Sequence, residues 1–240
     1  MTDEICSRDA YLATCEANVV GVTDRGVMLD RTVFYARGGG QPGDSGLLRS
    51  GDVTIAVTDT VRDRDTGEVL HVLGGEPPAV GQAVTCELDW PRRHTHMRTH
   101  TALHALSGVI FRDYGAKVTG GNIDSGGLAR MDFELDAMSV ELGRDVEAKL
   151  NGLLAEDRPV HVLLLPRAEA LADPDLIRTK VNLVPASVDP IRVIDIDRID
   201  KQADGGTHVR STGEIDLVRV VKTESKGRAN KRMRIQLEDV

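Results

Sequence analysis

The chain has 240 residues, 3% of them aromatic, and a formal net charge of −8 at pH 7. This length is enough for one large or two modest domains, and with so few aromatic side chains their cores must consist mainly of Val, Leu, Ile and Ala. The negative charge argues against a protein whose whole surface attracts nucleic acid, because Lys and Arg supply most nonspecific affinity for phosphates.

The sequence also argues against a membrane or secreted protein. No apolar run approaches the roughly 20 residues of a membrane span, and the first residues lack the basic and apolar regions of a signal peptide. The three cysteines form no CxxC pair, which suits a reducing compartment. We therefore expect a soluble, cytoplasmic protein with no membrane partner.

In the first part of the chain, short apolar runs alternate with turn residues, a pattern typical of a small antiparallel β-barrel. The runs are Val27–Leu29, Thr32–Tyr35, Val53–Val57, Val69–Leu73 and Val84–Leu88. The sequence Asp89-Trp90-Pro91 ends this pattern. We predict an N-terminal barrel domain over residues 1–90 and a second domain over residues 91–240.

The second part combines two helical patterns with several strand patterns. Apolar residues at helical spacing predict helices over 92–114 and 139–156, with Gly115 ending the first and Ser139 capping the second. Strands are predicted at Val160–Leu165, Ile191–Ile196, Ile215–Val221 and Met233–Leu237. Helices against a mostly antiparallel sheet make this domain, and the protein as a whole, α+β.

Histidines in the first of these helices have the spacing of metal ligands. His100 and His104 are four residues apart, so both rings project from one helix face with Cβ atoms about 6 Å apart. Asp204 and His208 add a carboxylate and a third imidazole later in the chain, and zinc accepts both ligand types. The alternative is a pair of hydrogen-bonded core histidines. The register is also open, since His96 continues the same spacing.

Two further segments allow a functional and a structural interpretation. Between Lys222 and Arg234 there are six basic residues and one acidic residue, which suits either an anionic partner or a charged sheet edge. The run Gly38-Gly39-Gly40-Gln41 lacks the Lys-Ser/Thr of a P-loop, and it is either a contact for the substrate or a loop between barrel strands. A metalloprotease is excluded, because Thr101 follows His100 where that motif requires Glu.

Several ordered motifs together resemble the freestanding alanyl-tRNA editing proteins of AlaX type, in particular the medium-length members. The motifs are His100-Thr-Ala-Leu-His104, Gly205–Ile215, Thr32–Tyr35 with Gly38–Gly46, Leu165–Ala170 and Lys226–Arg232. They extend over nearly the whole chain. The sequence contains no pattern from which an oligomeric state can be predicted.

This resemblance implies a hydrolase that acts in trans on tRNA(Ala) mischarged with serine, and in medium members often with glycine, and that spares the correct alanyl ester. The family holds zinc with the two histidines of an HxxxH helix and with a Cys and a His of a CxxxH segment. Here Asp204 stands where the family has Cys. We predict His100, His104, Asp204 and His208 as metal ligands, with the three histidines as catalytic residues, and zinc or another divalent ion as cofactor.

The resemblance also suggests which residues recognise the substrate. Thr119 aligns approximately with a threonine that reads the serine hydroxyl in short family members, and the glycine-rich run should border the editing pocket or the acceptor end of the tRNA. Thr119, Gly120 and Gln41 are therefore predicted to contact the substrate; the alternative for Thr119 is a strand residue before a turn. Two rival functions remain: a metal-dependent hydrolase of another small ester or amide, and a noncatalytic tRNA-binding module.

Overall fold

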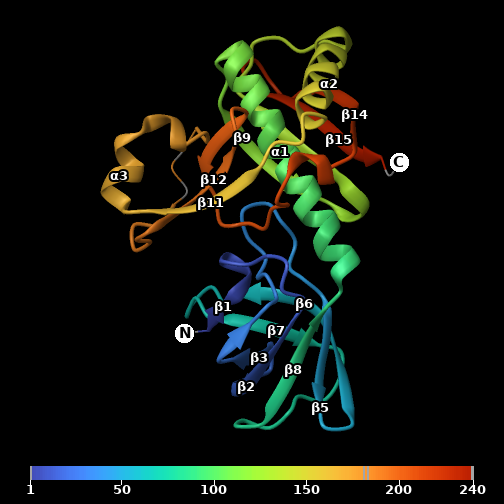
Figure 1. Ribbon diagram of the computed structural model, residues 1–240, viewed down its shortest axis with the longest axis vertical. Coiled ribbons are helices and arrows are strands. Elements are labelled where there is room, and N and C mark those ends of the chain that lie inside the picture. Colours follow the sequence, from blue (N-terminus) through green and yellow to red (C-terminus); the bar gives the residue numbers. More distant parts are fainter. Residues whose placement is uncertain (1, 181, 183, 239–240) are drawn as a thin grey trace. The chain divides into compact units, whose positions relative to one another are not determined.

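The computed structural model describes residues 2–180, 182 and 184–238, and it has the α+β fold that the sequence predicts (Figure 1). The chain forms two compact units, Met1–His96 and Met97–Val240. The division falls within the long helix α1 (Trp90–Tyr114). The assignment of residues 1–90 and 91–240 as functional domains stays a prediction.

The first unit contains the predicted closed antiparallel barrel. Its strand order is β2 (Thr14–Thr23), β3 (Gly26–Leu29), β7 (Val69–Leu73), β6 (Val53–Arg62), β5 (Gly46–Ser50) and β8 (Ala83–Leu88). A short parallel pair, β1 (Asp3–Glu4) with β4 (Arg31–Thr32), lies outside the barrel sheet. Alternate residues of the strands are buried, and Val19, Leu29, Leu48, Val57 and Val84 belong to one apolar core. Such alternation is what a closed sheet with a filled interior requires.

The predicted strand Thr32–Tyr35 is only partly correct, because β4 ends at Thr32. The backbone N–H groups of Phe34 and Tyr35 bind side chains in place of a neighbouring strand: that of Phe34 donates to Thr32 Oγ1 (3.1 Å) and that of Tyr35 donates to Asp44 Oδ2 (2.6 Å). Phe34 is nevertheless fully buried in the barrel core. The apolar run thus indicated burial, and burial alone does not distinguish a strand from an ordered loop.

A buried ion pair between Asp44 and Arg93 holds the glycine-rich segment between β4 and β5 in place. Arg93, which has no exposed surface, donates from Nε (2.9 Å) and from Nη2 to Asp44 Oδ2, and from Nη2 to Val33 O (2.7 Å). Gly43 allows the segment to pass close to β6, since a Cβ there would lie 2.1 Å from Thr60 O. Asp44 and Gly43 therefore have a structural role in this segment.

In the residues that the structure describes, the second unit contains two antiparallel sheets and three helices, counting α1. One sheet has the order β14 (Leu217–Ser225), β15 (Lys231–Glu238), β10 (Leu128–Phe133) and β9 (Val118–Ile123), and the other has the order β11 (Val160–Leu165), β12 (Ile191–Ile196) and β13 (Asp200–Ala203). The remaining helices are α2 (Val140–Leu154) and α3 (Arg167–Ala172). Short 3-10 turns occur at Ile5–Ser7, Ser125–Gly127, Pro174–Leu176 and Thr212–Glu214.

Both predicted helices of this unit are present. Ser139 caps α2 as expected, its hydroxyl accepting the N–H of Leu142 (3.1 Å), and Asn151 joins α2 to β14 through two hydrogen bonds with the backbone of Val218. The middle of α1 is buried on all its faces, since every residue from 99 to 110 is buried. Its polar side chains on all faces must therefore find partners inside the protein. Among the described residues, no helix is both long and apolar enough to cross a membrane.

Candidate metal centre

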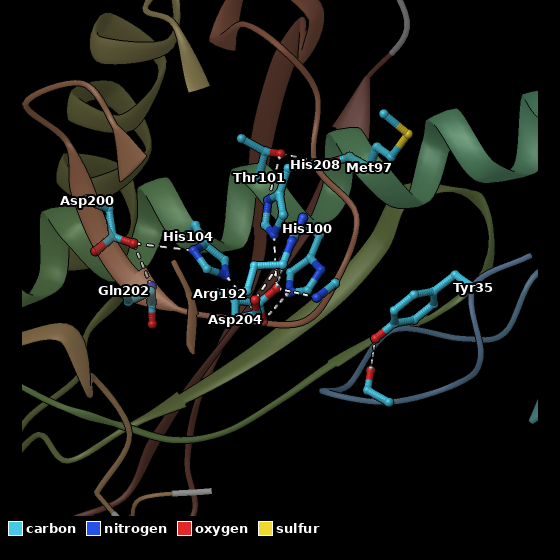
Figure 2. Close-up of polar contacts among 12 residues, drawn as sticks. Tyr35, Met97, His100, Thr101, His104, Arg192, Asp200, Gln202, Asp204 and His208 are labelled. Carbon is cyan, nitrogen blue, oxygen red and sulfur yellow. Dashed lines mark hydrogen bonds and ion pairs between the residues drawn. The ribbon is translucent and has the colours of Figure 1, made fainter. Parts of the chain in front are cut away.

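The four residues predicted as metal ligands lie together in the second unit. His100 and His104 project from one face of α1, and the loop after β13 brings Asp204 and His208 to them (Figure 2). One nitrogen or oxygen from each residue lies within 4.8 Å of the others, and the three imidazole centroids are 4.5–5.1 Å apart. His96, which continues the helical spacing, does not belong to the group found among the described residues. The register is thus His100 with His104.

The carboxylate of Asp204 is the common neighbour of the three rings. Its Oδ1 lies 3.6 Å from His100 Nε2 and 3.8 Å from His104 Nε2, and its Oδ2 lies 3.1 Å from His208 Nε2. Each histidine therefore presents the same ring nitrogen, Nε2, to one small volume. Zinc binds imidazole nitrogen at about 2.0–2.1 Å and carboxylate oxygen at about 2.0–2.2 Å, so one ion can be shared by atoms at this spacing.

Asp204 and His208 have the protonation states that suit a cation, whereas His104 must lose a proton to bind one. Burial opposes ionisation of Asp204, but the charge on His100 and the contacts with His104 and His208 hold the pKa of its carboxyl well below the ordinary value. Burial and the neighbouring charge of His100 lower the pKa of His208 well below 6.5, so this ring is neutral. Burial also disfavours the charged form of His104, yet Asp200 and Asp204 raise its pKa to about 9. An ionised carboxylate and a neutral imidazole are the forms that bind metals.

The donor set fits a divalent ion of the zinc type. Three imidazole nitrogens and one carboxylate oxygen are ligands that zinc accepts in tetrahedral sites, and each of the three histidines is at most 5% exposed. A carboxylate is harder than a thiolate, so the set is also compatible with other divalent ions.

Among the described residues, the metal group contains none of the three residues predicted to contact substrate. Thr119 is an exposed residue of β9 whose Oγ1 donates to Asn230 Oδ1 (2.9 Å), and Gly120 pairs with Asp132 in the ladder of β9 and β10. Gln41, in the first unit, is 1% exposed, and its backbone exchanges hydrogen bonds with Gly38. Their role in substrate binding stays a prediction.

Several cations of the basic segment from Lys222 to Arg234 are paired with two carboxylates, Asp132 and Glu224. Arg232 makes two hydrogen bonds with Asp132 (2.6 and 2.8 Å), and the ammonium group of Lys231 donates to backbone carbonyl groups. Glu224 pairs with three further cations: Lys222, Lys226 and Arg234. These pairs lower the pKa of Glu224 to about 2, Arg234 contributing most. Lys222 lies on the edge strand β14, whereas Lys231, Arg232 and Arg234 lie on β15, between β14 and β10, so both interpretations of the segment stay open.

Sequence reasoning missed Thr101 and Asp200, which contact two of the ligand histidines. Thr101 Oγ1 lies 3.1 Å from His208 Nδ1, and Asp200 Oδ2 lies 3.3 Å from His104 Nδ1 (Figure 2). The only available signal for Thr101 was its position inside the HxxxH motif. Asp200 had no signal, because its neighbour His104 is distant in sequence and only the tertiary structure brings them together.

Comparison with known proteins places this architecture in a class. Residues 10–92 match the model of class II (A) tRNA synthetases, and residues 191–234 match the second additional domain of threonyl and alanyl tRNA synthetases. The second match includes Asp204 and His208. The fold and the site therefore define a relative of the domains that accompany class II aminoacyl-tRNA synthetases.

Full-length relatives define the family more closely. The alanyl-tRNA editing protein AlaX-M of Methanosarcina barkeri is 36% identical over 247 residues, covering 100% of both chains. That of Saccharolobus solfataricus is 35% identical, covering 97% of this chain and 98% of the relative. The alanine–tRNA ligase of Pyrobaculum aerophilum is 39% identical over 93% of this chain and 25% of its own length. The chain belongs to the alanyl-tRNA editing proteins, as its motifs suggested.

Proposed function

We propose that this protein is a metal-dependent aminoacyl-tRNA deacylase that hydrolyses the ester of mischarged tRNA(Ala) in trans. The observation that carries the proposal is the convergence of His100, His104, Asp204 and His208 in a chain whose full-length relatives are alanyl-tRNA editing proteins. The acceptor end of that tRNA is the proposed partner, and we expect the protein to work in the cytoplasm, where tRNA is charged.

The four side chains would hold Zn²⁺, with Asp204 in the place of the family's cysteine. A divalent ion there supplies Lewis acidity toward a carbonyl group or a water molecule. Because Asp204 is a harder ligand than thiolate, we expect weaker zinc binding than in relatives with cysteine, and greater tolerance of other divalent ions. An aminoacyl ester is already activated, so the chain needs mainly to position a water molecule against the ester carbonyl and to stabilise the developing oxyanion.

We propose serine as the principal amino acid removed, and glycine as a second one. Serine exceeds alanine by one hydroxyl, and a site that must hydrogen-bond this group can reject the analogue without it by about 10⁴-fold or more. Thr119 is the proposed reader, with Gly120 and Gln41 as further contacts. Since the Thr119 hydroxyl hydrogen is donated to Asn230, its oxygen is available to accept the hydrogen of a serine hydroxyl.

The test uses purified protein, quantified metal, and tRNA(Ala) charged separately with serine, glycine and alanine. We expect the seryl ester to be hydrolysed, the alanyl ester to be spared, and activity to be lost on chelation and in His100→Ala. Hydrolysis of the seryl ester that persists after both treatments would refute the proposed mechanism. Metal binding without any deacylation would favour a hydrolase of another small ester or amide. Salt-sensitive tRNA binding without metal or turnover would favour a noncatalytic binding module.

A further inference from the structure

The hydrogen bonds of Thr101 determine which nitrogen of His208 carries a hydrogen. Thr101 is fully buried in α1, and its Oγ1 donates its one hydrogen to Met97 O (2.8 Å), the carbonyl one turn earlier. The oxygen can then only accept, and it accepts from the backbone N–H of Val209 (3.2 Å) and from His208 Nδ1 (3.1 Å). The hydrogen in the contact between Thr101 and His208 therefore belongs to Nδ1. With a cation bound between them, the lone pair of the ring is on Nε2, which faces Asp204.

Asp200 acts in the same way on His104. Its Oδ2 lies 3.3 Å from His104 Nδ1, an ion-pair contact whose alignment falls short of a hydrogen bond, and it also accepts from Gln202 Nε2 (2.6 Å). The Asp200 side chain has no exposed surface. Because an ionised carboxylate only accepts, the hydrogen in this contact belongs to Nδ1 of His104. The other nitrogen, Nε2, faces Asp204 Oδ1 at 3.8 Å.

A glycine in α1 allows Asp200 to approach the helix. Gly108 lies four residues after His104, so both occupy the same helix face. A Cβ at Gly108 would lie 2.3 Å from Ile199 O and 3.1 Å from Asp200 Cβ. The start of β13 thus packs directly against this glycine. This close packing places the Asp200 carboxylate beside the ring of His104, one turn earlier in α1.

We propose that Thr101 and Asp200 are positioning residues of the metal centre. They hold the Nδ1–H of His208 and His104, respectively, so that both rings present Nε2 to one divalent cation. The inference rests on the proposed function, because it requires that His104 and His208 bind a metal. Residues that contact the second ring nitrogen of a histidine ligand commonly raise metal affinity about 10–100-fold, since they orient the ring and fix its tautomer.

The first test measures zinc affinity by competition with a chromophoric chelator. We expect Kd to rise about 10–100-fold in Thr101→Val, which keeps the shape and loses the acceptor, and in Asp200→Ala. Thr101→Ser, which keeps the hydroxyl, should restore near-native affinity. Thr95→Val is the matched control, because Thr95 makes the same bond to a carbonyl one turn earlier in α1 (2.9 Å, to Pro91 O). Asp195→Ala on β12 is the control for Asp200, and both controls should bind zinc as the wild type does.

The second test needs no variant that could fail to fold. Long-range ¹H–¹⁵N correlation spectra of the zinc-loaded wild type distinguish the two ring nitrogens of each histidine. We expect His104 and His208 to carry hydrogen on Nδ1 and the metal on Nε2. A hydrogen on Nε2 of either ring, or native zinc affinity in Thr101→Val and Asp200→Ala, overturns this inference alone. Failure of the wild type to bind zinc overturns both this inference and the proposed metal dependence.

Discussion

His71 should make the stability of the first unit depend on pH. This histidine is fully buried, its Nδ1 faces Val27 O (3.2 Å), and its Nε2 faces Thr32 Oγ1 (2.8 Å). Because the carbonyl of Val27 only accepts, Nδ1 carries the hydrogen, and Nε2 accepts the hydrogen of the Thr32 hydroxyl. A second ring hydrogen would disrupt that pair. Burial lowers the pKa of His71 from 6.5 to about 4, although the bond to Val27 raises it slightly.

The magnitude follows from the difference between the folded and unfolded pKa values. Each pKa unit corresponds to about 1.4 kcal/mol, so the neutral ring accounts for about 3 kcal/mol of stability at pH 8 relative to pH below 4. Between pH 6.5 and 4 the unfolded chain binds a proton that the folded unit does not. Stability is therefore complete above pH 6.5 and falls as the pH is lowered, with about 2 kcal/mol lost at pH 5.

Denaturant unfolding followed by the fluorescence of Trp90, the single tryptophan, reports on the first unit. The experiment compares the wild type with His71→Gln at pH 8 and pH 5, in chelator so that metal release does not contribute. We expect His71→Gln to be destabilised at pH 8, and the difference from the wild type to shrink by about 2 kcal/mol at pH 5. A difference that does not change with pH would refute the reasoning.

Three further changes test other parts of the structure. Arg93→Met leaves Asp44 as an unpaired buried carboxylate and should cost about 3–5 kcal/mol of unfolding free energy in denaturant titrations; a loss below about 1 kcal/mol would contradict the assigned role of the pair. Gly108→Ala should lower thermal stability by about 1–3 kcal/mol, because the clash with Ile199 O exceeds the gain in helix propensity; a higher melting temperature would show that β13 yields easily. Asp204→Cys should lower the Kd for zinc at least about tenfold in chelator competition, because a thiolate is the softer ligand. Unchanged or weaker binding would indicate that residue 204 does not contact the metal.

Elements with a clear local period were predictable from the sequence. The runs Val160–Leu165 and Ile191–Ile196 are strands with the expected bounds, and the capped helix α2 lies where its apolar spacing placed it. Strand β9 was missed, since Gly120 and Gly121 carry no side chains that could display an alternating pattern. The strand predicted at Thr32–Tyr35 became mostly a loop because side chains of Thr32 and Asp44 replaced a neighbouring strand as acceptors.

The sequence by itself determined the candidate ligands. His100 and His104 share a helix face by their spacing, and the motif around Asp204 and His208 supplied the other two. Only the tertiary structure decided that these side chains meet and that His96 is outside the group. It also decided that Thr101 and Asp200 contact Nδ1 of His208 and His104. The physical reason is the separation along the chain over which each effect acts. Helical periodicity relates residues a few positions apart. The partners of a polar side chain in the buried middle of a helix depend on which distant strands and loops pack against it.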